Sequence, residues 1–212
     1  RPSYHFGEFG EDIFVDRILR NITKGKYVDV GSYHPFKGSL TLKLYKKNWS
    51  GINIDLSKTS IDLFKIARKK DINLNIAISD FNGVTSYYEN SPINQQNSLI
   101  KKNENQKEVK IQCFTLNSIL KEKNVENIDY LNVDVEGSEL EVIKGIDLSK
   151  FNPSLISIEN NDLSLKDYME SDIYNLLIQN KYTLVNIIGV TNFFMPDKLV
   201  KEIPNLIKIL SL

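Results

Sequence analysis

The segment from Lys26 to Gly31, Lys-Tyr-Val-Asp-Val-Gly, constrains the fold more than any other part of the chain. A strand that is buried on both faces of a parallel sheet shows a nearly continuous apolar run. Val28 and Val30 supply that run, and Gly31 marks a point where another group approaches the backbone closely. Ligands of open α/β sheets bind beyond the carboxyl ends of the strands. The segment therefore predicts that Asp29 and Gly31 line a small-molecule site.

Strand and helix patterns alternate along most of the chain. Helices are expected at 8–22, 39–48, 57–67, 115–123 and 138–144, with one more ending near residue 180. Strands are expected at 51–55, 74–78, 109–114, 130–135 and 153–159, with a hairpin at 182–190 and 191–195. This order predicts an α/β fold with a doubly wound, mostly parallel sheet and a C-terminal antiparallel hairpin. We interpret 1–212 as a single domain, and its Arg1-Pro2 start favours a piece of a longer polypeptide.

The alternation lapses between residues 80 and 108, a segment called the insertion below. Asn82-Gly83 is a hairpin signal, and Tyr87 and Tyr88 suggest an outer strand. Residues 94–98 are the most loop-like part of the chain. Long irregular insertions in compact domains more often bind ligands than connect elements. We therefore expect the insertion to be an acceptor-binding loop.

The composition excludes several classes of function. Hydrophobic residues make up 41% and charged residues 25% of the 212 residues, which is typical of a globular domain. The 27 basic residues cancel the 27 acidic ones, so the balance predicts neither nucleic-acid nor membrane-surface binding. The single cysteine, Cys113, excludes an internal disulfide and fits a reducing, cytoplasmic compartment. No apolar run approaches the ~18 residues that span a bilayer, so no membrane insertion is expected.

Carboxylates end several of the predicted strands. They are Asp29, Asp55, Asp134 and Glu159, and parallel strands bring such ends to one edge of the sheet. Asp55 follows Gly31 by 24 residues (55 − 31). In nucleotide-binding folds, an acid about 20 residues beyond a glycine-rich turn accepts hydrogen bonds from ribose hydroxyls. The spacing therefore predicts an adenosine derivative as ligand.

The first turn differs from a dinucleotide-binding turn. The next glycine after Gly31 is Gly38, and Pro35 stands between them, so the G-x-G-x-x-G pattern is absent. A pyrophosphate needs several closely spaced glycine N–H groups. S-adenosylmethionine carries no phosphate, and a single glycine can admit its methionine portion. The turn therefore favours a methyl donor over a nicotinamide cofactor.

Several longer segments resemble the FkbM family of S-adenosylmethionine-dependent methyltransferases. They are residues 3–12, 27–35, 48–55, 75–79 and 128–140, of which the Asp134-Val135-Glu136-Gly137 block is the most specific. The match runs from about Ser3 to the hairpin near Met195. The chain departs from the family at Ser32, where alanine or another small residue is usual, and at residues 39–42. The resemblance implies a Rossmann-like class I methyltransferase fold.

The family resemblance also implies an activity and a set of donor-binding residues. The activity is O-methylation, commonly of hydroxyls on sugars, glycans or natural products. The donor-binding residues carried over are Asp29, Gly31, Ser32, Ser39, Thr41, Asp55, Ile78 and Asp134.

A hard-cation site is one device that would assist methyl transfer. Asp134 and the pair Glu159-Asn160, 25 residues later (159 − 134), offer oxygen ligands of the kind that Mg²⁺ or Mn²⁺ prefers. The pattern resembles that of metal-dependent catechol and sugar O-methyltransferases, with Asn161 as an alternative to Asn160. In a second interpretation, Asp134 and Glu136 hydrogen-bond the helix start at Ser138 and the cofactor.

A histidine base is the other device. Methyl transfer from a sulfonium mainly requires alignment of the acceptor oxygen, and a base lowers the cost of forming the alkoxide. His34 is the preferred candidate over His5, and Asp134 and Glu136 are further catalytic candidates.

The acceptor is expected to contact the insertion. Tyr87, Tyr88, Asn97 and Ser98 suit a sugar, although an ordinary exposed hairpin explains them equally well. The leading hypothesis is a sugar or glycan O-methyltransferase. A polyketide or lipid-like acceptor would need an apolar lid, which the polar insertion disfavours. A donor-binding module fused to a larger glycan-assembly protein is a third hypothesis, which the carboxylates at positions 134, 136 and 159 disfavour.

Overall fold

The computed structural model describes residues 4–160 and 164–202. Its strands are β1 (Lys26–Val30), β2 (Ser50–Asp55), β3 (Ile72–Asn75), β4 (Ala77–Ile78), β5 (Gly83–Glu89), β6 (Lys107–Phe114), β7 (Tyr130–Val133), β8 (Leu155–Glu159), β9 (Tyr182–Ile188) and β10 (Thr191–Pro196). Its helices are α1 (Glu11–Ile18), α2 (Leu42–Lys46), α3 (Lys58–Ala67), α4 (Leu116–Glu122), α5 (Glu139–Lys144), α6 (Leu148–Phe151), α7 (Leu165–Glu170), α8 (Asp172–Gln179) and α9 (Asp197–Glu202).

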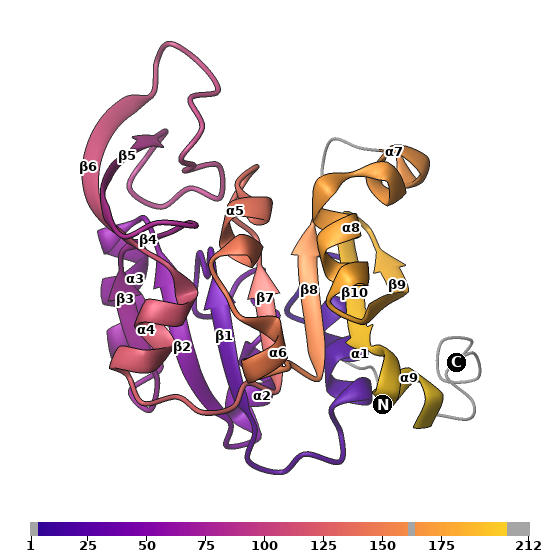
Figure 1. Ribbon diagram of the computed structural model, residues 1–212. Coiled ribbons are helices and arrows are strands. Elements are labelled where there is room, and N and C mark those ends of the chain that lie inside the picture. Colours follow the sequence, from indigo (N-terminus) through magenta and orange to yellow (C-terminus); the bar gives the residue numbers. More distant parts are fainter. Residues whose placement is uncertain (1–3, 161–163, 203–212) are drawn as a thin grey trace.

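A seven-stranded sheet with the order β3-β2-β1-β7-β8-β10-β9 forms the centre of the described structure (Figure 1). The neighbours from β3 to β8 are parallel, whereas β10 runs antiparallel to both β8 and β9. The predicted doubly wound sheet and its C-terminal antiparallel hairpin are therefore confirmed. The chain moves outward from β1 in two directions, so the strand order reverses between β1 and β7, where α/β folds place ligands.

Because side chains alternate between the two faces of the central strands, the apolar core has two parts. Val28, Val30, Leu131 and Val133 point into a cluster with residues of α4, α5, α6 and α8. Tyr27 and Tyr130 point into a second cluster with residues of α1 and α2. Asp29 and Asn132 share the sheet face of these two tyrosines, because side chains alternate along a strand. Helices on both faces bury the sheet, which explains the continuous apolar runs of its strands.

The predicted strand 74–78 divides into two. Residues Ile72–Asn75 stay in the main sheet as β3, whereas Ala77 and Ile78 form β4, which pairs in parallel with Cys113 and Phe114 of β6. The expected strand at 109–114 therefore lies in a second sheet, of order β4-β6-β5. Cys113 is fully buried there, as a core residue.

The hairpin expected at Asn82-Gly83 is wrong. This turn joins β4 to β5, but both strands pair with β6 rather than with each other. The antiparallel partner of β5 is β6, which is reached through residues 90–106. Tyr87 and Tyr88 do lie on an outer strand of this small sheet. Figure 1 shows β5, β6 and their connection standing out from one end of the molecule.

Several helices are shorter than their periodicity suggested. The helix expected at 39–48 covers Leu42–Lys46, and that expected at 8–22 covers Glu11–Ile18. Thr41 occupies the N-cap position of α2 but makes no capping bond, since its hydroxyl donates to Asp29 instead. Ser57, at the start of the helix expected at 57–67, caps α3 by accepting a hydrogen bond from the Ser60 amide.

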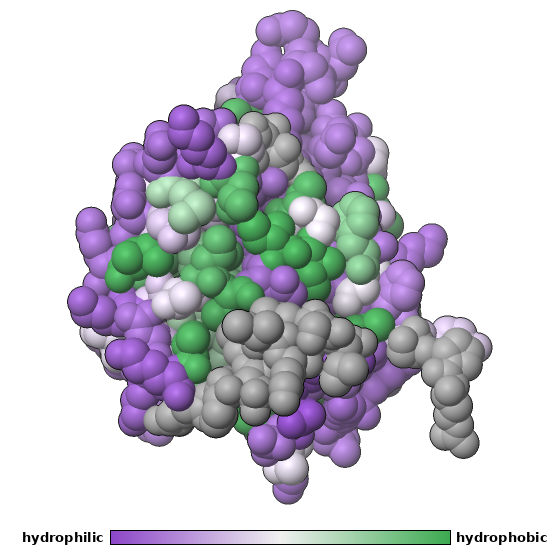
Figure 2. All heavy atoms as spheres, turned by 90° about the vertical axis from the view of Figure 1, so that its right-hand side faces the viewer, coloured by the Kyte–Doolittle hydropathy of each residue, from purple (hydrophilic) through white to green (hydrophobic). Residues whose placement is uncertain are grey.

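The far edge of the sheet is formed by β9. Figure 2 shows apolar side chains gathered on the face of the molecule that includes this edge. Within the described ranges, no helix combines the length and apolar character needed to cross a bilayer.

Candidate functional site

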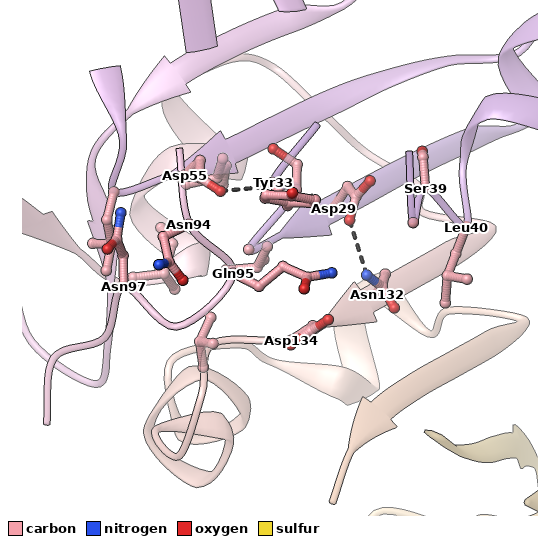
Figure 3. Close-up of a pocket in the computed structure, with 18 of the residues that line it drawn as sticks. Asp29, Tyr33, Ser39, Leu40, Asp55, Asn94, Gln95, Asn97, Asn132 and Asp134 are labelled. Atoms are coloured by element: carbon pink, nitrogen blue, oxygen red, sulfur yellow. Dashed lines mark hydrogen bonds between the residues drawn. The ribbon is translucent and has the colours of Figure 1, made fainter. Parts of the chain in front are cut away.

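A cleft opens beyond the carboxyl ends of β1, β2 and β7, and part of the insertion covers it (Figure 3). It is lined by Asp29, Val30, Gly31, Ser32, Tyr33, Gly38, Ser39, Leu40, Ile54, Asp55, Leu56, Ile76, Ile78, Asn94, Gln95, Asn97, Leu99, Asn132, Asp134 and Val135. Seven of the eight donor-binding residues expected from the family resemblance line this cleft, and Thr41 is the exception.

A glycine is required at position 31 because another part of the chain approaches its backbone closely. Its φ is +82°, and a Cβ atom at this position would lie 1.6 Å from the carbonyl oxygen of Asp134. The amides of Gly31 and Ser32 both donate to the carbonyl oxygen of Ile54, at 2.9 and 3.1 Å. The group predicted to approach Gly31 is therefore the backbone of the β7–α5 connection, and this contact forms the floor of the cleft.

The Asp55 carboxylate is held in place by two backbone amides. Its oxygens accept hydrogen bonds from Tyr33 N at 2.8 Å and Ser57 N at 2.7 Å, so Asp55 ties the loop after β1 to the start of α3. Burial raises the pKa of Asp55 to about 6, although these two bonds oppose the shift. The fixed carboxylate retains acceptor capacity for hydroxyl groups of a ligand.

Asp29 is buried at the side of the cleft. Its carboxylate accepts hydrogen bonds from Asn132 Nδ2 at 2.9 Å and from the Thr41 hydroxyl at 2.8 Å. Burial raises the pKa of Asp29, and the bonds from Asn132 and Thr41 oppose that shift. Thr41 lies beneath the cleft as a support for Asp29. Asn132 was missed from the sequence, where the only signal is a polar residue within an apolar strand.

Ser32 offers an unused hydrogen-bonding group to the cleft. The side chain is 5% exposed, and its hydroxyl has no partner among the described residues. A buried hydroxyl without a partner is costly, so a polar ligand group would relieve it. Together with the fixed carboxylate of Asp55, this hydroxyl makes the cleft fit a donor with a polar amino-acid end and a ribose.

Three carboxylates meet at the carboxyl ends of β7 and β8. One oxygen from each of Asp134, Glu136 and Glu159 lies within 4.8 Å of the others. Burial raises the pKa of Asp134 well above its usual range, and the charge of Glu159 adds to the shift. Lys102 of the insertion donates to Glu136 Oε2 at 2.6 Å.

The structure brings together two of the residues predicted to bind a metal. Asp134 and Glu159 lie together as expected. The Asn160 backbone amide donates to the carbonyl oxygen of Val190 at 2.8 Å, and the alternative ligand Asn161 lies outside the described residues.

Ser138, where a helix is expected to begin, occupies the N-cap position of α5. It makes no capping bond to α5; instead, Glu139 Oε1 accepts hydrogen bonds from Val135 N at 3.1 Å and Gly137 N at 3.0 Å. The Glu139 carboxylate thereby holds the loop before α5, in which Glu136 has a φ of +62°.

His34 does not line the cleft. Its Nδ1 accepts hydrogen bonds from Phe36 N at 3.1 Å and Lys37 N at 3.2 Å, so the ring closes a turn in the loop. Burial and the charge of Lys37 lower the pKa of His34. The Nδ1 atom of His5 bonds the carbonyl oxygen of Gly7 at 2.8 Å.

The insertion reaches the cleft through residues that were mostly not predicted. Asn94, Gln95 and Leu99 join the expected Asn97 in the lining, and Figure 3 shows Gln95 extending into the cleft. The expected Tyr87, Tyr88 and Ser98 are not lining residues.

Contacts with the β7–α5 connection and with the N-terminal segment explain the position of the insertion. The Ser98 hydroxyl donates to the carbonyl oxygen of Glu136 at 2.9 Å. Gln95 Nε2 donates to Glu8 Oε1 at 2.9 Å.

Comparison with known proteins agrees with the family resemblance. The model of the methyltransferase FkbM domain matches residues 29–184, which is most of the chain. A TehB-like S-adenosylmethionine-dependent methyltransferase from Corynebacterium glutamicum is similar in structure, with 11% identity, a TM-score of 0.47 and coverage of 89% of this chain and 88% of that one.

A second solved structure is that of 1,6-didemethyltoxoflavin-N1-methyltransferase from Burkholderia thailandensis, with bound 1,6-didemethyltoxoflavin and S-adenosylhomocysteine. It has 10% identity, a TM-score of 0.43 and coverage of 89% of this chain and 77% of that one. No curated protein matches the chain. The family match runs from Asp29 in β1 to Leu184 in β9 and includes all the residues named above as lining the cleft. The chain therefore belongs to the FkbM family of S-adenosylmethionine-dependent methyltransferases.

Proposed function

We propose that the protein transfers a methyl group from S-adenosylmethionine to a hydroxyl of a sugar or glycan. The observation that carries this proposal is the polar character of the insertion where it covers the cleft. Asn94, Gln95 and Asn97 bring amide groups beside the strand ends, with Leu99 as the apolar residue among them. Amides form hydrogen bonds with sugar hydroxyls, whereas a polyketide or lipid-like acceptor would require an apolar cover.

In this proposal, the donor lies along the lining of β1 and β2. The Asp55 carboxylate accepts the ribose hydroxyls, and Ile78 packs against the base. The methionine end lies by Gly31, where the Ser32 hydroxyl gains a partner. Ser39 contributes from the opposite wall. The methyl group then faces Asp134, beside the space under the insertion into which the acceptor enters.

Methyl transfer is an in-line displacement, so these residues act mainly by alignment. The acceptor oxygen attacks the methyl carbon as the carbon–sulfur bond breaks, and the acceptor proton passes to a base. Asp134 suits this role, because the pKa of its carboxyl is raised by burial and by Glu159, and Glu136 adds a second acceptor. His34 suits it less well, because its Nδ1 accepts two backbone N–H bonds and the neutral ring then carries its proton on Nε2.

The carboxylates of Asp134, Glu136 and Glu159 also fit a divalent cation. Three oxygens within 4.8 Å of one another form a hard donor set of the kind that Mg²⁺ or Mn²⁺ takes. When bound, such an ion would act as a Lewis acid toward the acceptor hydroxyl. The carboxylates also favour catalysis over a pure donor-binding module, which has no need of them.

Calorimetry with S-adenosylhomocysteine tests the donor, and a screen of sugar acceptors by mass spectrometry tests the reaction. We expect donor-product binding and a mass increase of one methylene on a hydroxyl-bearing sugar. Activity that is unchanged by exhaustive chelation would remove the cation from the mechanism. Methylation of apolar polyketides in the absence of sugar methylation would overturn the acceptor class.

A further inference from the structure

A buried arginine lies behind the part of the cleft that is assigned to the methyl donor. Arg68 follows the last turn of α3, and its side chain is fully buried. No ion pair to a carboxylate is recorded for it in the described ranges. A buried charge is costly unless hydrogen bonds satisfy it, so the partners of this guanidinium define its role.

The three oxygens that satisfy Arg68 belong to one loop. Nη2 donates to the Pro35 carbonyl oxygen at 2.8 Å and to the Ser39 hydroxyl at 2.6 Å, and Nε also faces Pro35 O at 3.3 Å. Nη1 donates to the Thr41 hydroxyl at 2.7 Å. The planar fork therefore holds the loop between β1 and α2 at three points.

The rings of Phe64 and Tyr45 hold the guanidinium from its sides. Their centroids lie 5.0 and 5.6 Å from its central carbon. These contacts restrict the fork to one orientation. The loop that it holds supplies Gly38, Ser39 and Leu40 to the cleft lining, although Arg68 itself does not reach the cleft.

A relay also connects Arg68 to Asp29. The Thr41 hydroxyl has a single proton; by accepting from Arg68 it is left to donate that proton to Asp29 Oδ2. The positive charge of Arg68 lowers the pKa of Asp29, against the larger effect of burial. Arg68 thus orients the hydroxyl and favours the charged form of the carboxylate.

We propose that Arg68 is a positioning residue of the methyl-donor site, which sets the wall at Ser39 and, through Thr41, the Asp29 carboxylate. The inference rests on the assignment of the cleft as the donor site. Arg68 holds the loop before α2 and packs against the two rings, and it is not among the residues that line the cleft. Its loss is therefore expected to weaken donor binding, whereas the rate of the chemical step at saturating donor should change little.

The test compares Arg68→Met, Arg68→Lys, Thr41→Val and Thr41→Ser with the wild type, using Arg17→Met on the exposed side of α1 as the control. S-adenosylhomocysteine affinity is measured by calorimetry, and donor KM and kcat are measured separately. Arg68→Met and Thr41→Val should each weaken affinity about tenfold or more, as expected for hydrogen bonds to a charged group. Arg68→Lys and Thr41→Ser should recover part of the loss, and kcat should change little.

A double variant separates positioning from general folding. Because Arg68 and Thr41 act in one relay, Arg68→Met with Thr41→Val should weaken affinity less than the two single effects combined. Thermal unfolding identifies any variant that does not fold, in which case Thr41→Val and Arg68→Lys decide the question. Folded variants with lowered thermal stability and wild-type affinity would show a structural role and overturn the proposal. Failure of the wild type to bind S-adenosylhomocysteine would instead overturn the donor site itself.

Discussion

The carbonyl oxygen of Asp134 lies 1.6 Å from the position that a Cβ atom would take on Gly31. This contact joins β1 to the end of β7 at the floor of the cleft, and it leaves no room for a side chain. The positive φ of Gly31 adds a second restriction, because the left-handed region is unfavourable for residues with a Cβ.

Gly31→Ala should therefore lower the thermal stability and abolish donor binding. The loss of stability should exceed the about 1–2 kcal/mol of a left-handed alanine, since the backbone of Asp134 must also move. Gly83→Ala is the matched control, because its Cβ would find its nearest neighbour, Phe81, at 3.8 Å. Thermal unfolding and calorimetry with S-adenosylhomocysteine measure the two effects. An alanine variant with normal stability would contradict the geometry.

The pKa of Asp55 should make donor affinity depend on pH. Below the pKa of about 6 the protonated carboxyl loses acceptor capacity for ribose hydroxyls, so affinity should fall as the pH is lowered from 7 to 5. Asp55→Asn should bind weakly without this dependence, and Asp62→Asn, on the surface of α3, should retain it. Calorimetry across the pH range gives the result, and a flat wild-type profile would argue against Asp55 as the ribose ligand.

The same group should affect the stability of the free protein in the opposite sense. A carboxyl whose pKa rises from 3.8 to about 6 on folding binds more protons in the folded state between those values. Its contribution to stability is therefore greatest at low pH and falls as the pH rises through that window. Denaturant unfolding of wild type and Asp55→Asn at pH 4.5 and 7 measures this contribution. The unfolding free energy of the wild type relative to that of Asp55→Asn should be higher at pH 4.5 than at pH 7.

Glu159→Gln should stabilise the free protein and remove its response to divalent cations. The charge of Glu159 raises the pKa of Asp134, so at neutral pH the two carboxyls oppose folding unless they share a proton or bind a cation. Removing one charge should raise the unfolding free energy by about 1 kcal/mol. Thermal unfolding with and without MgCl₂ or MnCl₂ is the measurement, with the exposed Glu126→Gln as control. An equal shift in thermal unfolding with cation in the wild type, Glu159→Gln and Glu126→Gln would exclude this cluster as the binding site.

Gln95 and Gln96 provide a matched pair on the insertion. Both side chains are exposed, but Gln95 lines the cleft and bonds Glu8, whereas the neighbouring Gln96 is not among the lining residues. Gln95→Ala should raise the acceptor KM about three- to tenfold, the range of one or two lost hydrogen bonds, and Gln96→Ala should leave it unchanged. Steady-state kinetics with the acceptor found by the screen distinguish them. Equal effects of the two substitutions would remove the insertion from acceptor recognition.

Local patterns in the sequence determined the type of most elements and the end of the sheet at which the site lies. The valines at 28 and 30 and the glycine at 31 identify a buried parallel strand that ends at a cleft, and the cap at Ser57 depends only on its own helix. The helix expected at 39–48 is shorter in the structure, where the Thr41 hydroxyl donates to Asp29 on another element instead of capping the helix.

Tertiary structure decided which further residues meet the predicted ones in the cleft. Asn132 and Asp29 are 103 positions apart, and their hydrogen bond depends on the pairing register of β1 and β7. The departure of β4 to the small sheet likewise depends on β6, which follows much later in the chain. Arg68 stands beside Lys69 and Lys70 in the sequence, and only the fold places its side chain behind Ser39. Periodicity reports which face of an element is buried, but contacts between distant residues arise from packing, for which a single sequence carries no local signal.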